Sequence, residues 1–124
     1  MKKFVMLSLF GAVVLASGCS KKEPLTPAQQ WNGYCTSIGN AARSIVLDRQ
    51  NGITQAAAEE YANKVKDPTT RGFAHEQIKK AYALPETELM ADRDAVQLRF
   101  KQEAEQICLN TPHDPNKLPD YKQF

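Results

Sequence analysis

Apolar residues recur every three or four positions through most of the chain after residue 26, and this spacing limits the possible folds more than any other feature. Such a spacing places side chains on one face of an α-helix. The first series that shows it contains Trp31, Cys35, Ile38, Ala42, Ile45 and Arg49. We therefore expect an all-α fold, a small bundle of about four helices within residues 27–110.

The first helix has signals at both ends. Residues 26–29, Thr-Pro-Ala-Gln, place a threonine N-cap before a proline and a glutamine, which predicts a capping box. The pair Asn51-Gly52 predicts the end, because glycine readily adopts the left-handed conformation that terminates a helix. Arg49 would then lie in the last turn, where its charge interacts favourably with the helix dipole.

Two glycines, Gly33 and Gly39, fall inside this predicted helix. Each costs about 1 kcal/mol relative to alanine in a helix interior. A closely packed neighbour would compensate for that cost, and we expect the neighbour to be another helix of the same chain.

A second, short helix is predicted over residues 55–65, with Thr54 as its cap. Its apolar side would carry Ala57, Tyr61 and Val65. Residues 67–72, Asp-Pro-Thr-Thr-Arg-Gly, predict a break, because proline and glycine both interrupt the helical pattern.

The pattern resumes over residues 73–84 and ends at Pro85, which disfavours a helical conformation in the residue before it. A fourth helix is expected over residues 86–110, with Glu86 and Glu88 in its first turn. Its apolar face would consist of Leu89, Val96, Phe100, Ala104 and Ile107. Residues 111–124 contain three prolines and predict an irregular C-terminal tail, in which Tyr121 and Phe124 either dock onto the bundle or stay apart from it.

The N-terminus has the order of features typical of an export signal. Met1-Lys2-Lys3 is basic, residues 4–16 are apolar, and residues 16–19, Ala-Ser-Gly-Cys, are small. The apolar run is too short for a permanent bilayer span, which needs about 20 residues. Ala16 and Gly18 also satisfy the small-x-small rule of an ordinary secretory signal, so cleavage to a soluble exported protein is the alternative.

Residues 15–19 resemble the lipobox of bacterial lipoproteins, although Ala16 stands where that family favours leucine. The resemblance implies that residues 1–18 are a cleaved signal peptide, that Cys19 is lipidated and attached to the membrane by its acyl chains, and that residues 19–26 form a tether. Ser20 follows the cysteine, where an aspartate commonly retains such proteins in the inner membrane. The resemblance thus implies the periplasmic side of the outer membrane rather than the inner membrane.

The chain has three cysteines. If Cys19 is lipidated, Cys35 and Cys108 remain as an even pair in an oxidising compartment. Antiparallel packing of the first and fourth helices would bring these two thiols to the same end, so a structural disulfide is predicted. A zinc site is the weaker alternative, because the only histidines, His75 and His113, do not complete a metal-finger spacing.

A second resemblance covers most of the mature part. Cys35, Ala42, Ile45, residues 49–52 (Arg-Gln-Asn-Gly), Ala81, Tyr82, Phe100 and Cys108 are similar to a pattern in small exported helical proteins of proteobacteria whose function is not established. It implies a helical fold and a disulfide, and it implies no activity.

No constellation of catalytic residues stands out. His75 and His113 are isolated, and the acidic residues Glu59-Glu60, Asp92 and Asp94 are expected on solvated faces. Trp31 is expected in the core, with a position facing the membrane or a partner as the alternative. An enzyme would need a polar pocket around His75 or around Asp92 and Asp94, and no enzyme, cofactor or metal is expected.

Net charge gives no support for a nucleic-acid partner. The chain has 16 basic and 14 acidic residues. Loss of Lys2 and Lys3 with the signal peptide would leave equal numbers, whereas nucleic-acid binding requires a basic surface.

These observations predict a lipid-anchored, non-enzymatic cell-envelope protein that binds another envelope protein as an accessory subunit or inhibitor. The alternative is a structural or stress-related lipoprotein that acts on the membrane or on peptidoglycan without a protein partner. No small-molecule substrate is expected.

Overall fold

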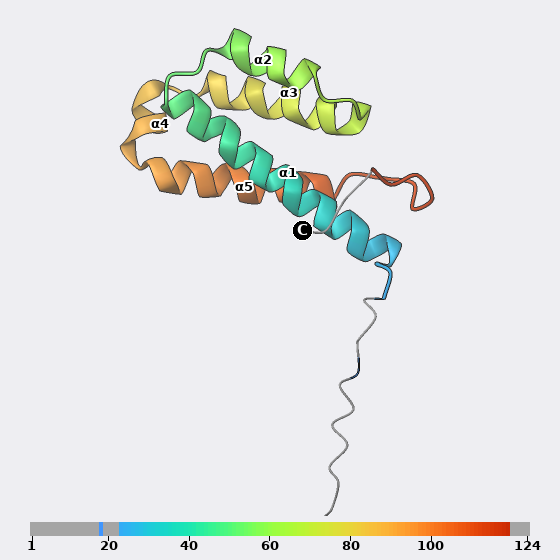
Figure 1. The fold of residues 1–124 in the computed structure, drawn as a ribbon. Coiled ribbons are helices and arrows are strands. Elements are labelled where there is room, and N and C mark those ends of the chain that lie inside the picture. The colour runs from blue at the N-terminus through green and yellow to red at the C-terminus, as the bar shows by residue number, and fades with distance from the viewer. Residues whose placement is uncertain (1–17, 19–22, 120–124) are drawn as a thin grey trace, which may run out of the picture.

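The computed structural model describes Gly18 and residues 23–119 (Figure 1). Apart from Gly18, the predicted signal peptide lies outside the described residues, as do Cys19, the predicted lipidation site, and the aromatic residues Tyr121 and Phe124. The described part contains the helices α1 (Pro27–Gln50), α2 (Gln55–Asn63), α3 (Pro68–Ala83), α4 (Glu86–Ala91) and α5 (Arg93–Leu109), and it contains no strand. The predicted all-α bundle is confirmed, with five helices instead of about four.

Helix α1 is the centre of the bundle. It packs against α5 along one side and against α3 along another, whereas α3 and α5 make little contact with each other (Figure 1). Helix α2 lies on the outer side of α3 and makes little contact with α1. Because Cys35 meets Cys108 while Gln50 meets Gln97, α1 and α5 run antiparallel.

Both ends of α1 lie where the sequence predicts them. Thr26 Oγ1 accepts a hydrogen bond from the Gln29 backbone N–H at 3.2 Å, and Gln29 Oε1 accepts one from the Thr26 N–H at 2.9 Å. The helix ends at Gln50, and Gly52 has a φ of 89°, the left-handed conformation that glycine tolerates. The capping box and the Asn51-Gly52 stop are therefore confirmed.

Helix α3 begins earlier than predicted. Residues 67–72 were expected to form a break, yet Asp67 is the N-cap of α3 and Pro68 is its first residue. Asp67 Oδ2 accepts hydrogen bonds from the Thr70 backbone N–H and from Thr70 Oγ1, both at 2.7 Å. An aspartate before a proline starts a helix here, since proline at the first position gives up no helical hydrogen bond.

The predicted fourth helix is interrupted at Asp92. This residue has the extended conformation φ −142°, ψ 94°, and its side chain accepts a hydrogen bond from the Ala95 N–H at 3.1 Å. Asp92 therefore ends α4 and caps α5, and it was wrongly placed within one continuous charged face. Glu88 Oε1 bonds Arg99 Nη2 at 2.9 Å and ties the two helices together across the interruption.

The core forms mainly between α1, α3 and α5. Its buried residues are Trp31, Tyr34, Cys35, Ile38, Ala42, Val46, Ala81, Leu89, Val96, Phe100, Ala104 and Cys108. A smaller cluster of Ala58, Ala62 and Ile78 joins α2 to α3. Two predicted apolar positions are wrong, because Ile107 is 42% exposed and Tyr61 is 72% exposed.

Cys35 and Cys108 form the predicted disulfide. Their Cα atoms are 5.4 Å apart, and neither residue is exposed. The bridge links the N-terminal part of α1 to the last turn of α5, across 73 positions of sequence. It therefore fixes the two longest helices at the end of the bundle where the chain enters it.

Gly39 allows the close approach of α1 to α5. A Cβ atom at this position would lie 2.8 Å from the Lys101 carbonyl oxygen and 3.2 Å from Glu105 Cβ. The expectation that a helix of the same chain compensates for a glycine in α1 is confirmed at this position. Gly72 in α3 is different, because a Cβ there would meet nothing within 4 Å.

Removal of the disulfide by the double substitution Cys35→Ala and Cys108→Ala should lower the free energy of unfolding by about 4 kcal/mol, because a long loop is released in the unfolded chain. Urea denaturation measures the change. Reductant should lower the urea midpoint of the wild-type protein and leave that of the double variant unchanged. An unchanged wild-type midpoint in reductant would contradict this role of the bridge.

Gly39 and Gly72 provide a matched pair of substitutions. Gly39→Ala should destabilise the fold by about 1–2 kcal/mol, because the clash with a backbone carbonyl outweighs the gain in helix propensity. Gly72→Ala should stabilise it by about 0.5–1 kcal/mol, since only the propensity changes. Thermal denaturation of both variants tests the contrast, and equal shifts would show that the approach of α1 to α5 is looser than described.

Candidate functional site

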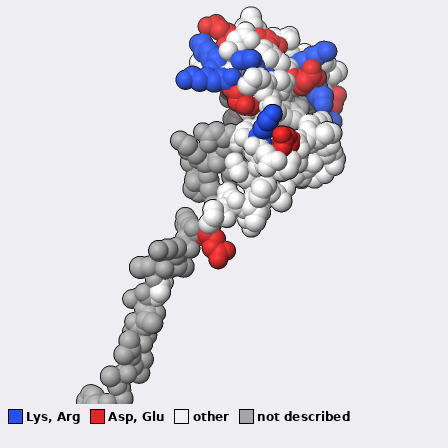
Figure 2. Space-filling view, turned by 90° about the vertical axis from the view of Figure 1, so that its right-hand side faces the viewer, with Lys and Arg blue, Asp and Glu red and all other residues white. Residues whose placement is uncertain are grey.

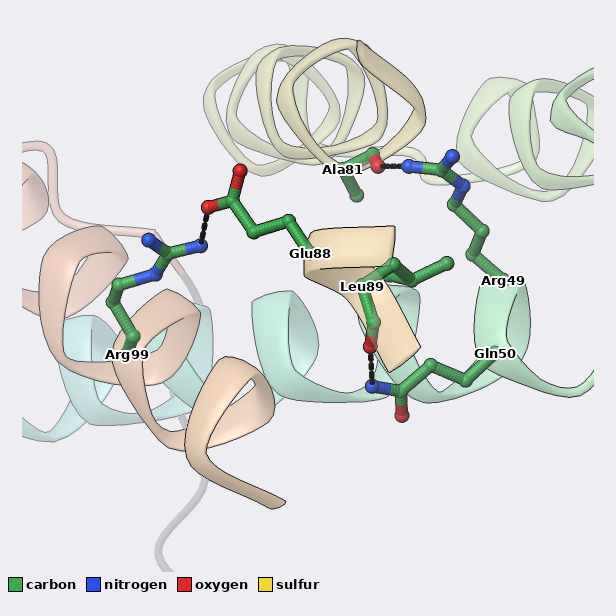
Figure 3. A network of polar contacts seen from close by, with 6 residues as sticks. All are labelled: Arg49, Gln50, Ala81, Glu88, Leu89 and Arg99. Atoms are coloured by element: carbon green, nitrogen blue, oxygen red, sulfur yellow. Dashed lines mark hydrogen bonds and ion pairs between the residues drawn. The ribbon is translucent and has the colours of Figure 1, made fainter. Parts of the chain in front are cut away.

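Residues 49–52, which end α1, hold three other helices in place. Arg49 Nη1 donates to the Ala81 carbonyl (Figure 3). Its Nη2 donates to the Leu84 carbonyl at 2.7 Å. Both acceptors lie at the C-terminal end of α3, where carbonyls lack partners within the helix. Arg49 was expected to complement the dipole of its own helix, and the structure shows that it caps α3.

Gln50 connects the same end of α1 to α4 and α5. Its Nε2 donates to the Leu89 carbonyl at 3.0 Å (Figure 3) and also to the Arg93 carbonyl at 3.1 Å. Its Oε1 accepts from Gln97 Nε2 at 2.7 Å, and Arg43 Nε donates to Gln97 Oε1 at 3.3 Å. Both glutamines are buried, so the network satisfies polar groups that would otherwise destabilise the core.

Asn51 completes this group of contacts, because its Oδ1 accepts from Arg93 Nη2 at 2.8 Å. Each of these contacts joins helices, and none of the side chains is a nucleophile next to a base. The Arg-Gln-Asn-Gly stretch is therefore a structural junction. A sequence pattern alone could not reveal this, because the acceptors are backbone carbonyls of distant residues.

The two histidines have different partners. His75 Nδ1 contacts Glu59 Oε2 and so links α3 to α2, with both side chains 34% exposed. His75 was expected to be isolated, whereas the structure pairs it with Glu59. The ring of His113 stacks on Trp31, with ring centroids 3.9 Å apart, and so holds the start of the tail against α1.

Trp31 is 4% exposed, which confirms its core position. Its Nε1 is the one buried side-chain polar atom without a hydrogen-bond partner in the described part of the chain. The ring also lies 5.2 Å from that of Tyr34. Aromatic contacts therefore hold this end of α1.

Two tyrosines have perturbed titration. Burial raises the pKa of Tyr34, a hydrogen bond with Thr70 lowers it, and Asp67 raises it. Burial and the nearby Asp48 raise the pKa of Tyr82, whereas Arg49 lowers it. Tyr34 forms a hydrogen bond with Thr70 at 2.9 Å, and the Tyr82 hydroxyl donates to the Ile53 carbonyl at 2.6 Å.

Within residues 23–119, no group of three or more His, Cys, Asp or Glu side chains is placed to hold a metal ion. Among the described helices, none has the length and apolar character needed to cross a membrane.

A groove of about 460 Å³ separates α3 from the C-terminal part of α5. We call it the α3–α5 groove. Its lining consists of Pro68, Thr69, Gly72, Phe73, Glu76, Gln77, Lys80, Ile107 and Thr111. The groove exists because α3 and α5 both pack on α1 and hardly touch each other.

A second groove lies between α1 and the α2–α3 pair, and we call it the α1–α2 groove. It has an inner part of about 110 Å³ and an outer part of about 380 Å³. The inner part is lined by Ile38, Ala41, Ala42, Ile45, Val65, Thr70, Phe73, Ala74 and Gln77. The outer part is lined by Ala41, Ser44, Ile45, Asp48, Ala58, Tyr61, Ala62, Val65, Ala74 and Ile78. Ala41, Ile45, Val65 and Ala74 line both parts, so the two parts adjoin.

The predicted candidates do not converge on either groove. Glu59, Asp92, Asp94 and the two histidines line neither one. The residues that line the grooves, such as Phe73 and Gln77, could not be identified from the sequence as site residues, because only their helical spacing distinguishes them.

Comparisons with protein families, with curated proteins and with solved structures find no match to this chain.

The junction at the end of α1 yields a stability prediction. Arg49→Lys should lower the free energy of unfolding by about 1.5–3 kcal/mol, because an ammonium cannot bond both α3 carbonyls as the planar guanidinium does. Arg99→Lys is the control, since its half-exposed ion pair with Glu88 contributes about 0.5 kcal/mol or less. Urea denaturation compares the two, and similar losses would contradict the capping role of Arg49.

Proposed function

We propose that this chain is a lipid-anchored, non-enzymatic protein of the bacterial cell envelope that binds another envelope protein as an accessory subunit or inhibitor. The lipobox-like residues 15–19 support the anchor, with lipidation at Cys19 and the periplasmic side of the outer membrane as the location. Two or three acyl chains hold a protein on a membrane durably, because each buried methylene contributes about 0.8 kcal/mol.

The observation that carries the proposal is the composition of the α3–α5 groove. Phe73 and the exposed Ile107 give it an apolar surface, and Glu76 and Lys80 add charges of both signs. An apolar centre with a polar rim is typical of protein–protein interfaces.

Gln77 adds a group suited to recognition. It is 4% exposed, lines the groove, and makes no side-chain hydrogen bond to another residue of the described chain. Its amide is available to pair with a group of the bound protein, and such a hydrogen bond contributes to specificity.

The groove is also held rigid. The disulfide fixes the C-terminal end of α5 to α1, and the Asp67 cap fixes the first turn of α3. Tyr34 of α1 bonds Thr70 of that same turn. A preformed surface loses less conformational entropy on binding, which favours a small domain as a binding module.

The distribution of charge is consistent with an anchored orientation. Figure 2 shows one face, on which basic and acidic side chains mix away from the tether while the adjoining surface is largely uncharged. Residues 24–42 contain no Asp, Glu, Lys or Arg. The tether over residues 19–26 reaches at most about 28 Å when extended, so the bound protein must lie close to the membrane.

Photo-crosslinking in whole cells tests whether the α3–α5 groove binds a partner protein. Ile107→benzoyl-phenylalanine should give one specific protein adduct, because this residue lines the groove. Leu98→benzoyl-phenylalanine is the control, since Leu98 is 49% exposed and lies outside both grooves. Equal adducts at the two positions, or none at Ile107, would contradict the proposal.

Protein from the same cells can be used to test lipidation and to distinguish the alternative function. The mass of the protein extracted from membranes should show acylation at Cys19, and Cys19→Ala should release the protein from the membrane. Binding of the purified domain to peptidoglycan, with no adduct at Ile107, would favour a structural or stress-related lipoprotein without a protein partner.

A further inference from the structure

We infer that the α1–α2 groove is a binding site for a single-chain amphiphile, whose hydrocarbon tail enters the inner part and whose cationic head lies at the outer part. This inference is independent of the partner proposed for the α3–α5 groove. It also goes beyond the expectation from sequence, which included no small molecule.

The groove persists because small side chains line it. Ala41 and Ser44 face it from α1, and Ala58 and Ala62 face it from α2. Helix α2 uses these two alanines to pack on Ile78 of α3, so it approaches α3 closely and leaves α1 uncovered. No side chain of α2 is large enough at these positions to fill the space.

The inner part is apolar and narrow. Most of its lining is carbon from residues such as Ile38, Ile45 and Phe73. The hydroxyl of Thr70 is already engaged by Asp67 and by Tyr34, which leaves only the Gln77 amide. A peptide backbone entering here would leave most of its polar groups unpaired, whereas a hydrocarbon chain needs no polar partner.

Size excludes a helix from the inner part. A helix with side chains is about 10–12 Å across, which does not fit a space of about 110 Å³. Apolar cavities that remain dry accept apolar ligands of small cross-section. An unbranched alkyl tail meets both the width and the chemistry of this space.

The outer part determines the head group. Asp48 is the only charged residue that lines either part of the groove, and Ser44 and Tyr61 lie with it in the outer lining. Tyr61 is 72% exposed, so an ammonium head can reach its ring, where it competes with Lys64 Nζ, which lies 5.2 Å from the ring centroid. A carboxylate beside an aromatic ring favours an ammonium head and disfavours an anionic one.

Three probes with the same tail test the site on the full mature protein. The probes are dodecyltrimethylammonium, dodecyl maltoside and dodecyl sulfate, each titrated below its critical micelle concentration. Calorimetry and amide NMR measure the binding. The ammonium probe should bind about tenfold or more tightly than the sulfate. The amide chemical shifts that change when the ammonium probe binds should be those of Ala41, Ile45, Tyr61 and Ala74.

Substitutions separate the tail site from the head site. Ala41→Leu and Ala74→Leu fill the space and should weaken binding of the ammonium probe by about tenfold or more, because the tail loses its cavity. Ala56→Leu is the control, as Ala56 is exposed on α2 and lines neither part. Ala41 is itself exposed, so Ala41→Leu retains a folded protein even if Ala74→Leu does not.

Asp48→Asn should remove the preference for ammonium over sulfate while the maltoside probe still binds. Glu103→Gln, an exposed substitution outside the groove, should leave the preference unchanged. Unchanged binding in Ala41→Leu, shifts that map to the α3–α5 groove, or equal affinity for all three probes would overturn the inference. Binding only to phospholipid vesicles, with no response to the single-chain probes, would overturn it as well.

Discussion

The close contact between α1 and α5 is the interaction on which the other helices depend. It is fixed at one end by the Cys35–Cys108 bridge and at the other by the buried Gln50–Gln97 pair. Between them, Gly39 lets the two backbones approach. Helices α3 and α4 are then attached to the end of α1 through Arg49 and Gln50, so they are held by the same helix that makes the α1–α5 contact.

Both grooves follow from this central position of α1. A helix that contacts α3 on one side and α5 on another keeps those two helices apart, and the α3–α5 groove is the space between them. The α1–α2 groove arises because α2 packs mainly on α3 and makes little contact with α1. The two spaces differ in chemistry, since the first has charges of both signs in its lining, whereas the second has an almost entirely apolar inner part and a single acidic residue in its outer part.

Local signals in the sequence predict much of this architecture, because caps and stops act within a few residues. Thr26, Gly52 and Pro85 mark helix ends correctly, and the cysteine count identifies the bridge. Asp67 and Asp92 were misjudged because an aspartate that caps a new helix also fits a loop or a charged face. The grooves could not be predicted, since they depend on which helices fail to touch, and periodicity identifies only the side of a helix that is buried.

The position of the bridge in the chain has a consequence for biogenesis. In the proposed export from N- to C-terminus, the thiol of Cys35 would emerge well before its partner, which is 73 positions further along. Cys19 is much nearer in sequence, and short loops close at a lower entropic cost, so a wrong pairing with Cys19 would compete. Acylation of the Cys19 sulfur, as proposed, removes that competitor and directs oxidation to the native pair.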